Sequence, residues 1–386
     1  MSATAAAPSA GVADDERWAR AAFTRWSESD DERVRALVRD VGWVVAAELA
    51  LAGDPLVPEV VRRRADRADV ERDLQLADAL GARLLCPGDP QWPVLLDDLA
   101  QPPVCLWVRG PLDLAEHAGE QPRSVSVVGA RASTRYGEQQ ASDLAAGLAE
   151  RGFAVVSGAA FGIDGAAHRG ALAVGGATVA VLAGGVDRPY PVAHTRLISA
   201  IAESGAVLSE VAPGSAPTRP RFLLRNRVIA ALGAGTLVVE AGLRSGSLHT
   251  AGVASRLNRP VGAVPGPVTS MASAGCHEAV RKGLAQLVTD VDEVAELVGG
   301  YGADLAPVKR APSRPEDALD LLETQILSMV PVRRPADAPS IAVAAGVPLS
   351  AVLTGLPRME LLGLVRRSAG RWRRVPPDDD GAGTGS

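Results

Sequence analysis

Short apolar runs alternate with amphipathic stretches between residues 124 and 298. The first amphipathic stretch repeats its apolar residues at the spacing that places them on one face of a helix. These residues are Ala141, Leu144, Ala145 and Leu148. Strands that are apolar throughout and alternate with helices are typical of a parallel sheet covered on both faces. The pattern predicts an extended Rossmann-like, doubly wound α/β domain. Its predicted strands are 125–128, 154–156, 178–182, 206–208, 237–239 and 261–264.

The segment before this domain has a different pattern. Residues 15–80 carry apolar positions at helical spacing, interrupted by Gly42 and Gly53, and predict a small helical domain. A proline-rich connector follows and ends in a predicted strand, so the α/β domain is assigned residues 81–300. Residues 1–14 are predicted to be disordered.

The C-terminal part predicts a third module. A Pro/Ala-rich linker over 301–315 leads to two helical stretches, 315–329 and 341–362, and then to a hairpin that turns at residues 368–370. This order predicts a winged helix over 316–376. Pro357 falls inside the predicted recognition helix, where proline removes a hydrogen bond. The acidic, glycine-rich residues 377–386 are predicted to be disordered.

The charge is distributed unevenly along the chain. The net charge of −5 argues, taken alone, against a nucleic acid partner. However, residues 210–259 hold seven arginines and two acids, and residues 358–374 hold six arginines and one acid, so each segment carries +5. Basic islands in an acidic chain are expected where phosphate is bound locally. The alternative for each run is a solvated helix face.

Several classes of protein are excluded by what the sequence lacks. The three cysteines form no CxxC pair, which argues against a zinc site or a disulfide scaffold and fits a reducing cytosol. No apolar run reaches the roughly 18 residues of a membrane span, and the first ten residues lack the features of a signal peptide. No P-loop motif occurs, and no GxGxxG stands in the first βα turn. We expect a cytoplasmic protein without a membrane segment, a bound metal or a cofactor.

Glycine or small hydroxyl residues follow nearly every predicted strand. Gly129 and Arg131 follow the first strand, Gly158 and Gly162 follow the second, and residues 245–250 follow the fifth. Ligands of open parallel sheets bind beyond the carboxyl ends of the strands. Glycines let backbone amides approach a ligand, and helix N-termini add partial positive charge, so this edge is suited to phosphate.

The most distinctive segment is TRPRFLLRNR, residues 218–227. If it is helical after Pro220, Arg221 and Arg225 line one face of the helix. Arginines bind phosphates, and an exposed Phe222 would stack on a base. The alternative is a surface helix in which Phe222 is a buried core residue.

Asp164 and His168 stand four residues apart and could bind a metal or act as acid and base. No third ligand accompanies them, so a structural role is favoured for both. In that interpretation Asp164 caps a helix and His168 is held by a hydrogen bond.

Together these motifs resemble the DNA processing protein A family (DprA, also called Smf). The resemblance covers about residues 86–298 and includes, in order, VVGARASTRYG, VVSGAAFGIDGAAHRGAL, LSEVAPGSAPTRPRFLLRNRVIAAL and VVEAGLRSGSLHTAGVA. It implies a recombination mediator, not an enzyme, that binds single-stranded DNA, forms a homodimer and loads the RecA recombinase during natural transformation. It also implies an N-terminal domain of the SAM or helix-hairpin-helix type and, in many members, a C-terminal winged helix.

The resemblance also implies roles for single residues. Gly129 and Arg131 match the family's G-S-R loop, with Ala130 in place of the serine, and Arg219 and Phe222 match a basic residue and a base-stacking aromatic. The remaining matches are Arg225, Asn226 and Arg227 to R-N-R; Gly158, Gly162, Asp164 and His168 to G-I-D-x-x-A-H; and Ser245, Gly246, Ser247 and Thr250 to S-G-S-x-x-T. Leu223 replaces the family's usual proline after the phenylalanine.

Two other functions remain open. Residues 232–240 partly match the GGxGTxxE motif of enzymes that hydrolyse nucleoside 5'-monophosphates to the base and ribose phosphate. In that hypothesis Arg225 polarises the leaving phosphate and Glu240 acts as base, although Leu232 replaces the first glycine. A winged-helix transcription regulator with a ligand-sensing domain is the third possibility, and it would prefer double-stranded DNA.

Overall fold

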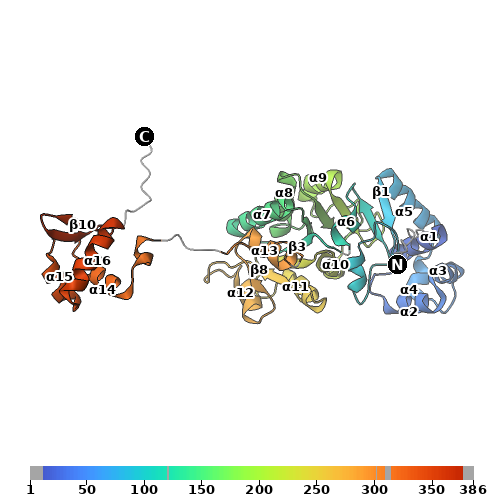
Figure 1. Ribbon diagram of the computed structural model, residues 1–386. Helices are drawn as coiled ribbons and strands as arrows, with labels where there is room; N and C mark the ends of the chain where they lie inside the picture. The colour runs from blue at the N-terminus through green and yellow to red at the C-terminus, as the bar shows by residue number, and fades with distance from the viewer. Residues whose placement is uncertain (1–11, 120, 301, 309–313, 377–386) are drawn as a thin grey trace, which may run out of the picture. The chain divides into compact units, whose positions relative to one another are not determined.

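The computed structural model describes residues 12–119, 121–300, 302–308 and 314–376. The chain forms two compact units that divide between Ala306 and Pro307, and each is described separately (Figure 1). The first helix, α1 (Asp14–Trp26), begins at the last residue predicted to be disordered. The disorder predicted for residues 1–11 and 377–386 lies outside the described residues.

A nine-stranded sheet organises the first unit, in the order β1-β2-β6-β5-β4-β3-β7-β8-β9. Neighbours from β6 to β9 pair in parallel, whereas β1–β2 and β2–β6 are antiparallel. The strands are β1 (Ala82–Leu85), β2 (Leu106–Arg109), β3 (Ser124–Val128), β4 (Ala154–Ser157), β5 (Thr178–Val181), β6 (Ala206–Ser209), β7 (Gly235–Val238), β8 (Val261–Ala263) and β9 (Gln286–Leu287). The mixed α/β fold with a large, mostly parallel sheet is confirmed. The six predicted strands correspond to β3 through β8, whereas β1 and the two-residue β9 were not predicted.

The strand order reverses beside β3. From β3 the chain builds β4, β5 and β6 on one side, and it then returns to place β7, β8 and β9 on the other side. Helices that follow adjacent strands on opposite sides of such a point diverge and leave a crevice at the carboxyl ends of the strands. Residues after β3 and around β7 therefore meet there.

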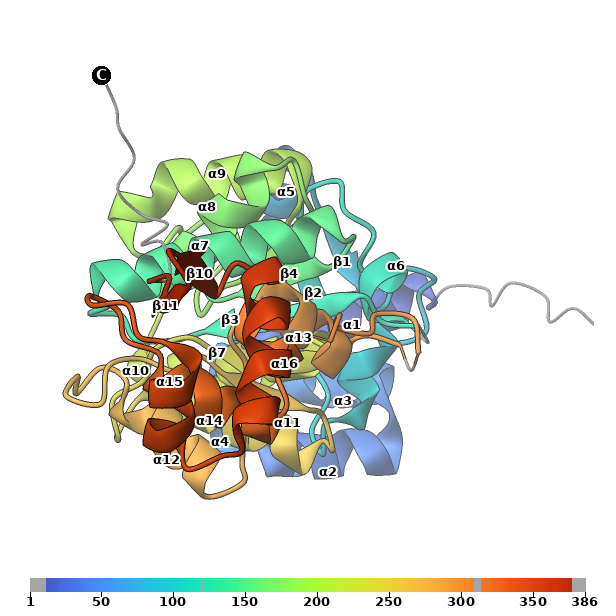
Figure 2. The same cartoon turned by 60° about the vertical axis from the view of Figure 1, so that its left-hand side comes forward.

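Helices cover both faces of the sheet. One layer contains α7 (Arg135–Glu150), α8 (Ile163–Ala173), α9 (Thr195–Ser204) and α13 (Val291–Val298), and Figure 2 shows the first three running together. The opposite layer contains α10 (Arg219–Leu232), α11 (Gly246–Arg256), α12 (Ala274–Arg281), the short α6 (Leu114–Ala118) and the 3-10 helix η1 (Val94–Asp98). Each layer has its own apolar core against the sheet.

Five N-terminal helices share an apolar core with the edge of the sheet. They are α1, α2 (Glu32–Val41), α3 (Trp43–Ala52), α4 (Glu59–Arg64) and α5 (Arg67–Ala79). Trp107 of β2 is fully buried in this core, and its indole N–H donates to Thr24 Oγ1 at 3.1 Å. Arg25 pairs with Asp73 and donates to the carbonyl of Pro213 at 2.8 Å. The helical segment is therefore packed as part of the first unit.

The described residues of the second unit form three α-helices, a short 3-10 helix and a hairpin around a separate core. Its elements are the 3-10 helix η3 (Pro315–Ala318), α14 (Leu321–Met329), α15 (Ala338–Ala345), α16 (Leu349–Leu361), β10 (Val365–Ser368) and β11 (Arg371–Arg374). The helical stretch predicted over 341–362 contains two helices, which are separated where Gly346 is left-handed at φ 61° and Pro348 follows it. Pro357 lies inside α16.

No single helix among the described residues is long and apolar enough to cross a membrane. One bent pair, α15 with α16, meets the length and composition test when its members are joined.

Candidate nucleic-acid interface

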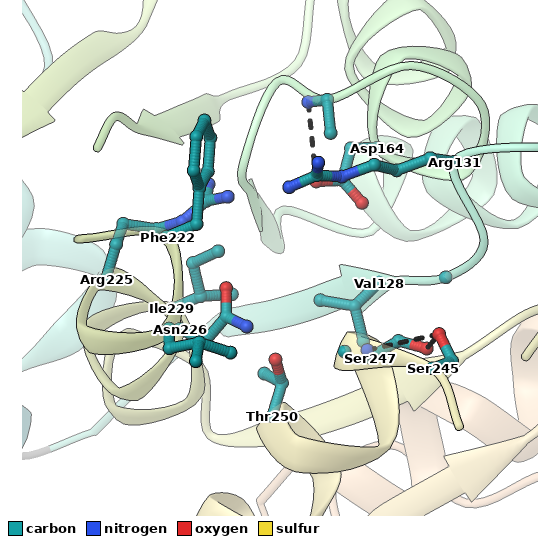
Figure 3. Close-up of a pocket in the computed structure, with 14 residues that line it drawn as sticks. Val128, Arg131, Asp164, Phe222, Arg225, Asn226, Ile229, Ser245, Ser247 and Thr250 are labelled. Carbon is teal, nitrogen blue, oxygen red and sulfur yellow. Dashed lines mark hydrogen bonds between the residues drawn. The ribbon is translucent and has the colours of Figure 1, made fainter. Parts of the chain in front are cut away.

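A pocket of about 280 Å³ opens at the reversal of strand order. Its wall is formed by the carboxyl end of β3 and the loop after it, α10 between residues 222 and 229, the N-terminus of α11, and residues 160 and 164. In Figure 3, Arg131 and Asp164 lie on one side, with α10 and the start of α11 on the others. The crevice expected from the topology therefore exists, and polar and apolar groups share it.

Ten of the fifteen residues singled out from the sequence line this pocket. They are Gly129, Arg131, Asp164, Phe222, Arg225, Asn226, Ser245, Gly246, Ser247 and Thr250. The five that do not are Gly158, Gly162, His168, Arg219 and Arg227. Four lining residues were missed: Val128, Ala160, Leu223 and Ile229. Ile229 follows Arg225 by four residues and Asn226 by three, so helical spacing could have identified it.

Phe222 is half-buried next to one cationic and one aromatic neighbour, and it does not lie in the core. The guanidinium carbon of Arg131 lies 4.9 Å from its ring centroid, and the ring of Tyr190 lies 5.4 Å from it. Arg131 is exposed, and no ion pair to it is found among the described residues. A cation and an aromatic face thus stand together at the mouth of the pocket, which is the combination that binds an unpaired nucleotide.

Three of the four arginines of α10 have surroundings that the sequence did not indicate. Arg225 does not share an exposed face with Arg221, because it is only 5% exposed and its Nη1 donates to the carbonyl of Val181 at 2.6 Å. Burial lowers the pKa of Arg225 to about 10, although the carboxylate of Asp164 opposes the shift. Arg221 pairs with Glu28 at 2.8 Å, and Arg227 pairs with the buried Glu210.

Three glycines hold this arrangement in place, and of these only Gly129 also lines the pocket. A Cβ on Gly158 would lie 1.8 Å from Nη1 of Arg225, so only glycine leaves room for that guanidinium. Gly162 has φ 75°, and a Cβ there would lie 2.3 Å from the carbonyl oxygen of Ala130. A Cβ on Gly129 would lie 2.5 Å from Ile163 Cγ1. These close approaches fix the loop after β3 against the loop after β4.

Asp164 binds the loop that precedes its own helix. Its Oδ2 accepts hydrogen bonds from the backbone N–H groups of Gly158 at 3.2 Å and Ala160 at 3.5 Å. Burial raises the pKa of Asp164, and the nearby Arg225 guanidinium opposes that shift. The predicted helix cap is wrong, because the N-cap of α8 is Gly162 and Asp164 binds the preceding loop instead. This contact is still a structural role.

His168 is fully buried and held in one tautomer. Thr178 Oγ1 donates its hydrogen to the carbonyl of Val155 at 2.8 Å, so the 2.7 Å contact to His168 Nδ1 requires that Nδ1 donate. Nε2 has no partner among the described groups, and burial lowers the pKa of His168 to about 3. A neutral, buried ring supports the structural role favoured for this residue.

The pKa of His168 predicts an acid-sensitive fold. In the unfolded chain the pKa of His168 is about 6.5, so below that pH the unfolded state binds a proton that the folded state does not bind. The free energy of unfolding therefore falls as the pH drops from 6.5 towards 3. Between pH 7.5 and pH 5 the wild type should lose about 2 kcal/mol more unfolding free energy than His168→Gln. Urea unfolding of both proteins measures this difference, and equal pH slopes would contradict it.

Glu240 does not face the pocket. Its carboxylate accepts hydrogen bonds from the N–H of Thr134 at 2.8 Å and from the Thr134 hydroxyl at 2.6 Å, and the side chain is 1% exposed. Its backbone carbonyl accepts the N–H of Ala130 at 2.7 Å. Glu240 thus ties the loop after β3 to the start of α7. No cluster of His, Cys, Asp or Glu able to hold a metal ion occurs in the described part of the chain.

A sequence model of the family described as DNA recombination-mediator protein A matches residues 83–299. The chain belongs to this family. The match contains every residue that lines the pocket.

Sequence similarity to a relative reaches beyond both ends of the region that the family model matches. A DNA processing protein DprA of Mycobacterium tuberculosis is 46% identical over 365 residues, covering 91% of this chain and 92% of the relative. The Smf protein of Escherichia coli is 37% identical over 296 residues, covering 75% and 77%.

Two solved structures of the family resemble this one. DprA from Streptococcus pneumoniae has a TM-score of 0.63 at 32% identity and covers 75% of this chain and 100% of its own. DNA processing protein A from Helicobacter pylori, described for its mode of binding single-stranded DNA, has a TM-score of 0.50 at 30% identity. It covers 55% of this chain and 93% of its own.

This member of the recombination-mediator family departs from the G-S-R pattern at Ala130. The backbone of Ala130 is occupied on both sides, since its N–H donates to Glu240 and its carbonyl accepts the N–H of Ile163 at 3.3 Å. The loop therefore keeps its shape through backbone contacts that a serine would share. The missing group is a hydroxyl donor next to Arg131.

Proposed function

We propose that this protein is a recombination mediator that grips single-stranded DNA at the pocket between β3, α10 and α11, without catalysing a reaction. One observation carries the proposal: Arg131, which is exposed and has no ion pair within the described part of the chain, lies over the half-buried ring of Phe222 at the mouth of that pocket. The ring offers a face to a base, and the guanidinium is placed for the adjoining phosphate.

The surroundings of the pocket support a strand rather than a single nucleotide. Arg219 and Arg244 are exposed on its two sides, and no ion pair to either is found among the described residues. The N-terminus of α11 points its first N–H groups at the same space, with Ser245 as the N-cap. Several separated positive groups around one aromatic face suit a backbone that runs through the site.

The hydrolase alternative is weakened by Glu240. The proposed base has both carboxylate oxygens engaged by Thr134, and it does not line the pocket. Incubation with AMP and chromatography for adenine tests this alternative directly, in parallel with a titration of labelled oligo-dT. Release of adenine at a rate above that of the buffer would favour the enzyme.

We further propose that the protein acts in the cytoplasm as a homodimer and loads RecA onto incoming DNA in natural transformation, and that its second unit is a winged helix. The family membership supports these roles.

In the second unit, the one arginine of α16, Arg358, pairs with Glu323 at 2.6 Å, whereas Arg366, Arg371 and Arg373 of the hairpin are exposed. Co-purification of the host's RecA with the protein on single-stranded DNA tests the loading role.

Phe222→Ala is expected to weaken oligo-dT binding by about 1–3 kcal/mol, because one base–aromatic stack is lost. The dependence of affinity on salt should stay the same, since no charge is removed. Fluorescence anisotropy at two salt concentrations measures both quantities. A variant that melts much earlier than the wild type would identify Phe222 as a core residue instead.

A further inference from the structure

A short segment after β5 connects two aromatic contacts on the rim of the pocket. At its start, the Tyr190 ring lies 5.4 Å from Phe222. At its end, the 3-10 helix η2 (Val192–His194) places the His194 ring 5.0 Å from Phe161 in an edge-to-face arrangement. The segment thus extends the aromatic surface away from Phe222 towards a second ring pair.

Phe161 lies beside the loop after β3, and about half of its side chain is exposed. Its neighbour Ala160 lines the pocket, and its other neighbour, Gly162, packs against the carbonyl oxygens of Ala130 and Arg131. The Phe161 side chain is nevertheless 49% exposed. Single exposed apolar residues are common on protein surfaces, but an exposed aromatic ring at the rim of a polar site indicates a surface for ligand binding.

The partner ring is fixed in position. The His194 Nδ1 lies 3.0 Å from the carbonyl oxygen of Ala159, and Gly165 leaves room for its other edge, since a Cβ there would lie 2.7 Å from His194 Cε1. Two rings from different loops are therefore preorganised before any ligand arrives. Such preorganisation lowers the entropy lost on binding.

Positive charge accompanies this second ring pair. Arg169 and Arg196 are exposed, and no ion pair to either is found in the described part of the chain. Nη1 of Arg169 lies 3.2 Å from the position of a Cβ on Gly165, next to His194. Aromatic faces interleaved with free arginines form the pattern that tracks a single strand.

We propose that Phe161 and His194 form a second base-stacking platform, which takes a further base of the strand whose first base stacks on Phe222. Arg169 and Arg196 bind the phosphates that join the two. This inference rests on the proposed function, and it extends the site from the pocket along the N-terminus of α8 and η2.

The test is a titration of the full chain with labelled oligo-dT of increasing length, from dT4 to dT20. Phe161→Ala should weaken binding of dT20 by roughly 5- to 100-fold, the effect of one lost stack, but leave the shortest bound oligonucleotide unaffected. Phe161→Trp should bind dT20 at least as well as the wild type. Val192→Ala removes an apolar side chain that is 77% exposed on the same segment and should change nothing.

The outcomes separate the two proposals. A loss with Phe222→Ala but none with Phe161→Ala overturns the second platform and leaves the proposed function standing. An equal loss with Phe161→Ala at every length also overturns it, since Phe161 would then belong to the primary site. No loss with either variant overturns the proposed function itself. If Phe161→Ala lowers the melting temperature, Phe161→Leu repeats the test with the apolar volume retained and the stack removed.

Discussion

Arg131→Glu should reduce the affinity for oligo-dT by at least about 100-fold while the protein remains folded. Arg131 is exposed and lies beside Phe222, and no ion pair to it is found among the described residues, so its charge is available to a phosphate. A charge-assisted hydrogen bond contributes about 1.5–3 kcal/mol, and reversal of the charge adds repulsion of the strand. Fluorescence anisotropy at moderate salt measures the loss.

Arg256→Glu is the matched control for this charge reversal. Arg256 is also exposed, and it lies in the last turn of α11, at the end of the helix that is remote from the pocket. The net charge changes equally in the two variants, so a general electrostatic effect would weaken both. Comparable losses in both variants, or an unchanged Kd for Arg131→Glu, would remove Arg131 from the site.

Gly158→Ala should destabilise the first unit strongly. The new Cβ would overlap Nη1 of Arg225 and displace a guanidinium that is buried and bonded to the carbonyl of Val181. Disturbing a buried charge with its hydrogen bonds costs about 3–5 kcal/mol. We expect a loss of unfolding free energy of about 3 kcal/mol and, because Arg225 lines the pocket, weaker binding of oligo-dT.

Gly252→Ala separates this steric effect from the ordinary effect of replacing a glycine. Gly252 lies inside α11, and the nearest atom to a Cβ there is 3.6 Å away, at the end of the Arg256 side chain. Alanine favours a helix over glycine by about 1 kcal/mol, so this variant should be as stable as the wild type or more so. Urea unfolding compares the two variants. Equal stabilities would show that Arg225 moves aside without cost.

The sheet could be predicted because most of its strands have a local sequence signal. Continuous apolar runs mark β3 through β8. Because parallel strands end at one edge of a sheet, the sequence alone places Gly129 and Ser245 in the same region. The edge strand β1 was missed, and so was β9, which is only two residues long and has both side chains exposed. Short exposed strands carry almost no hydrophobic signal.

The surroundings of each arginine on α10 could not be predicted from the same sequence. Arg221 pairs with Glu28, which is 193 residues away in the sequence. Arg225 is buried because Gly158, in the loop after β4, leaves room for its guanidinium and the carbonyl of Val181, at the end of β5, accepts its hydrogen bond. Helical spacing ranks faces by hydrophobicity and treats all four arginines of α10 as solvent-facing. Tertiary partners decide which charge remains free, and among the residues that the structure describes only Arg219 on this helix has none.

The burial of Trp107 bears on how the chain can be shortened. This indole is covered by the N-terminal helices, and it sits on a strand of the central sheet. A fragment that starts at residue 81 would lose that cover and present a large aromatic surface to water, which promotes association between copies. A fragment that ends at Ala306 keeps the whole of the first unit, including these helices. The first five helices and the sheet should therefore be treated as one folding unit. This applies to deletion series, to protease maps and to comparisons between shorter and longer relatives.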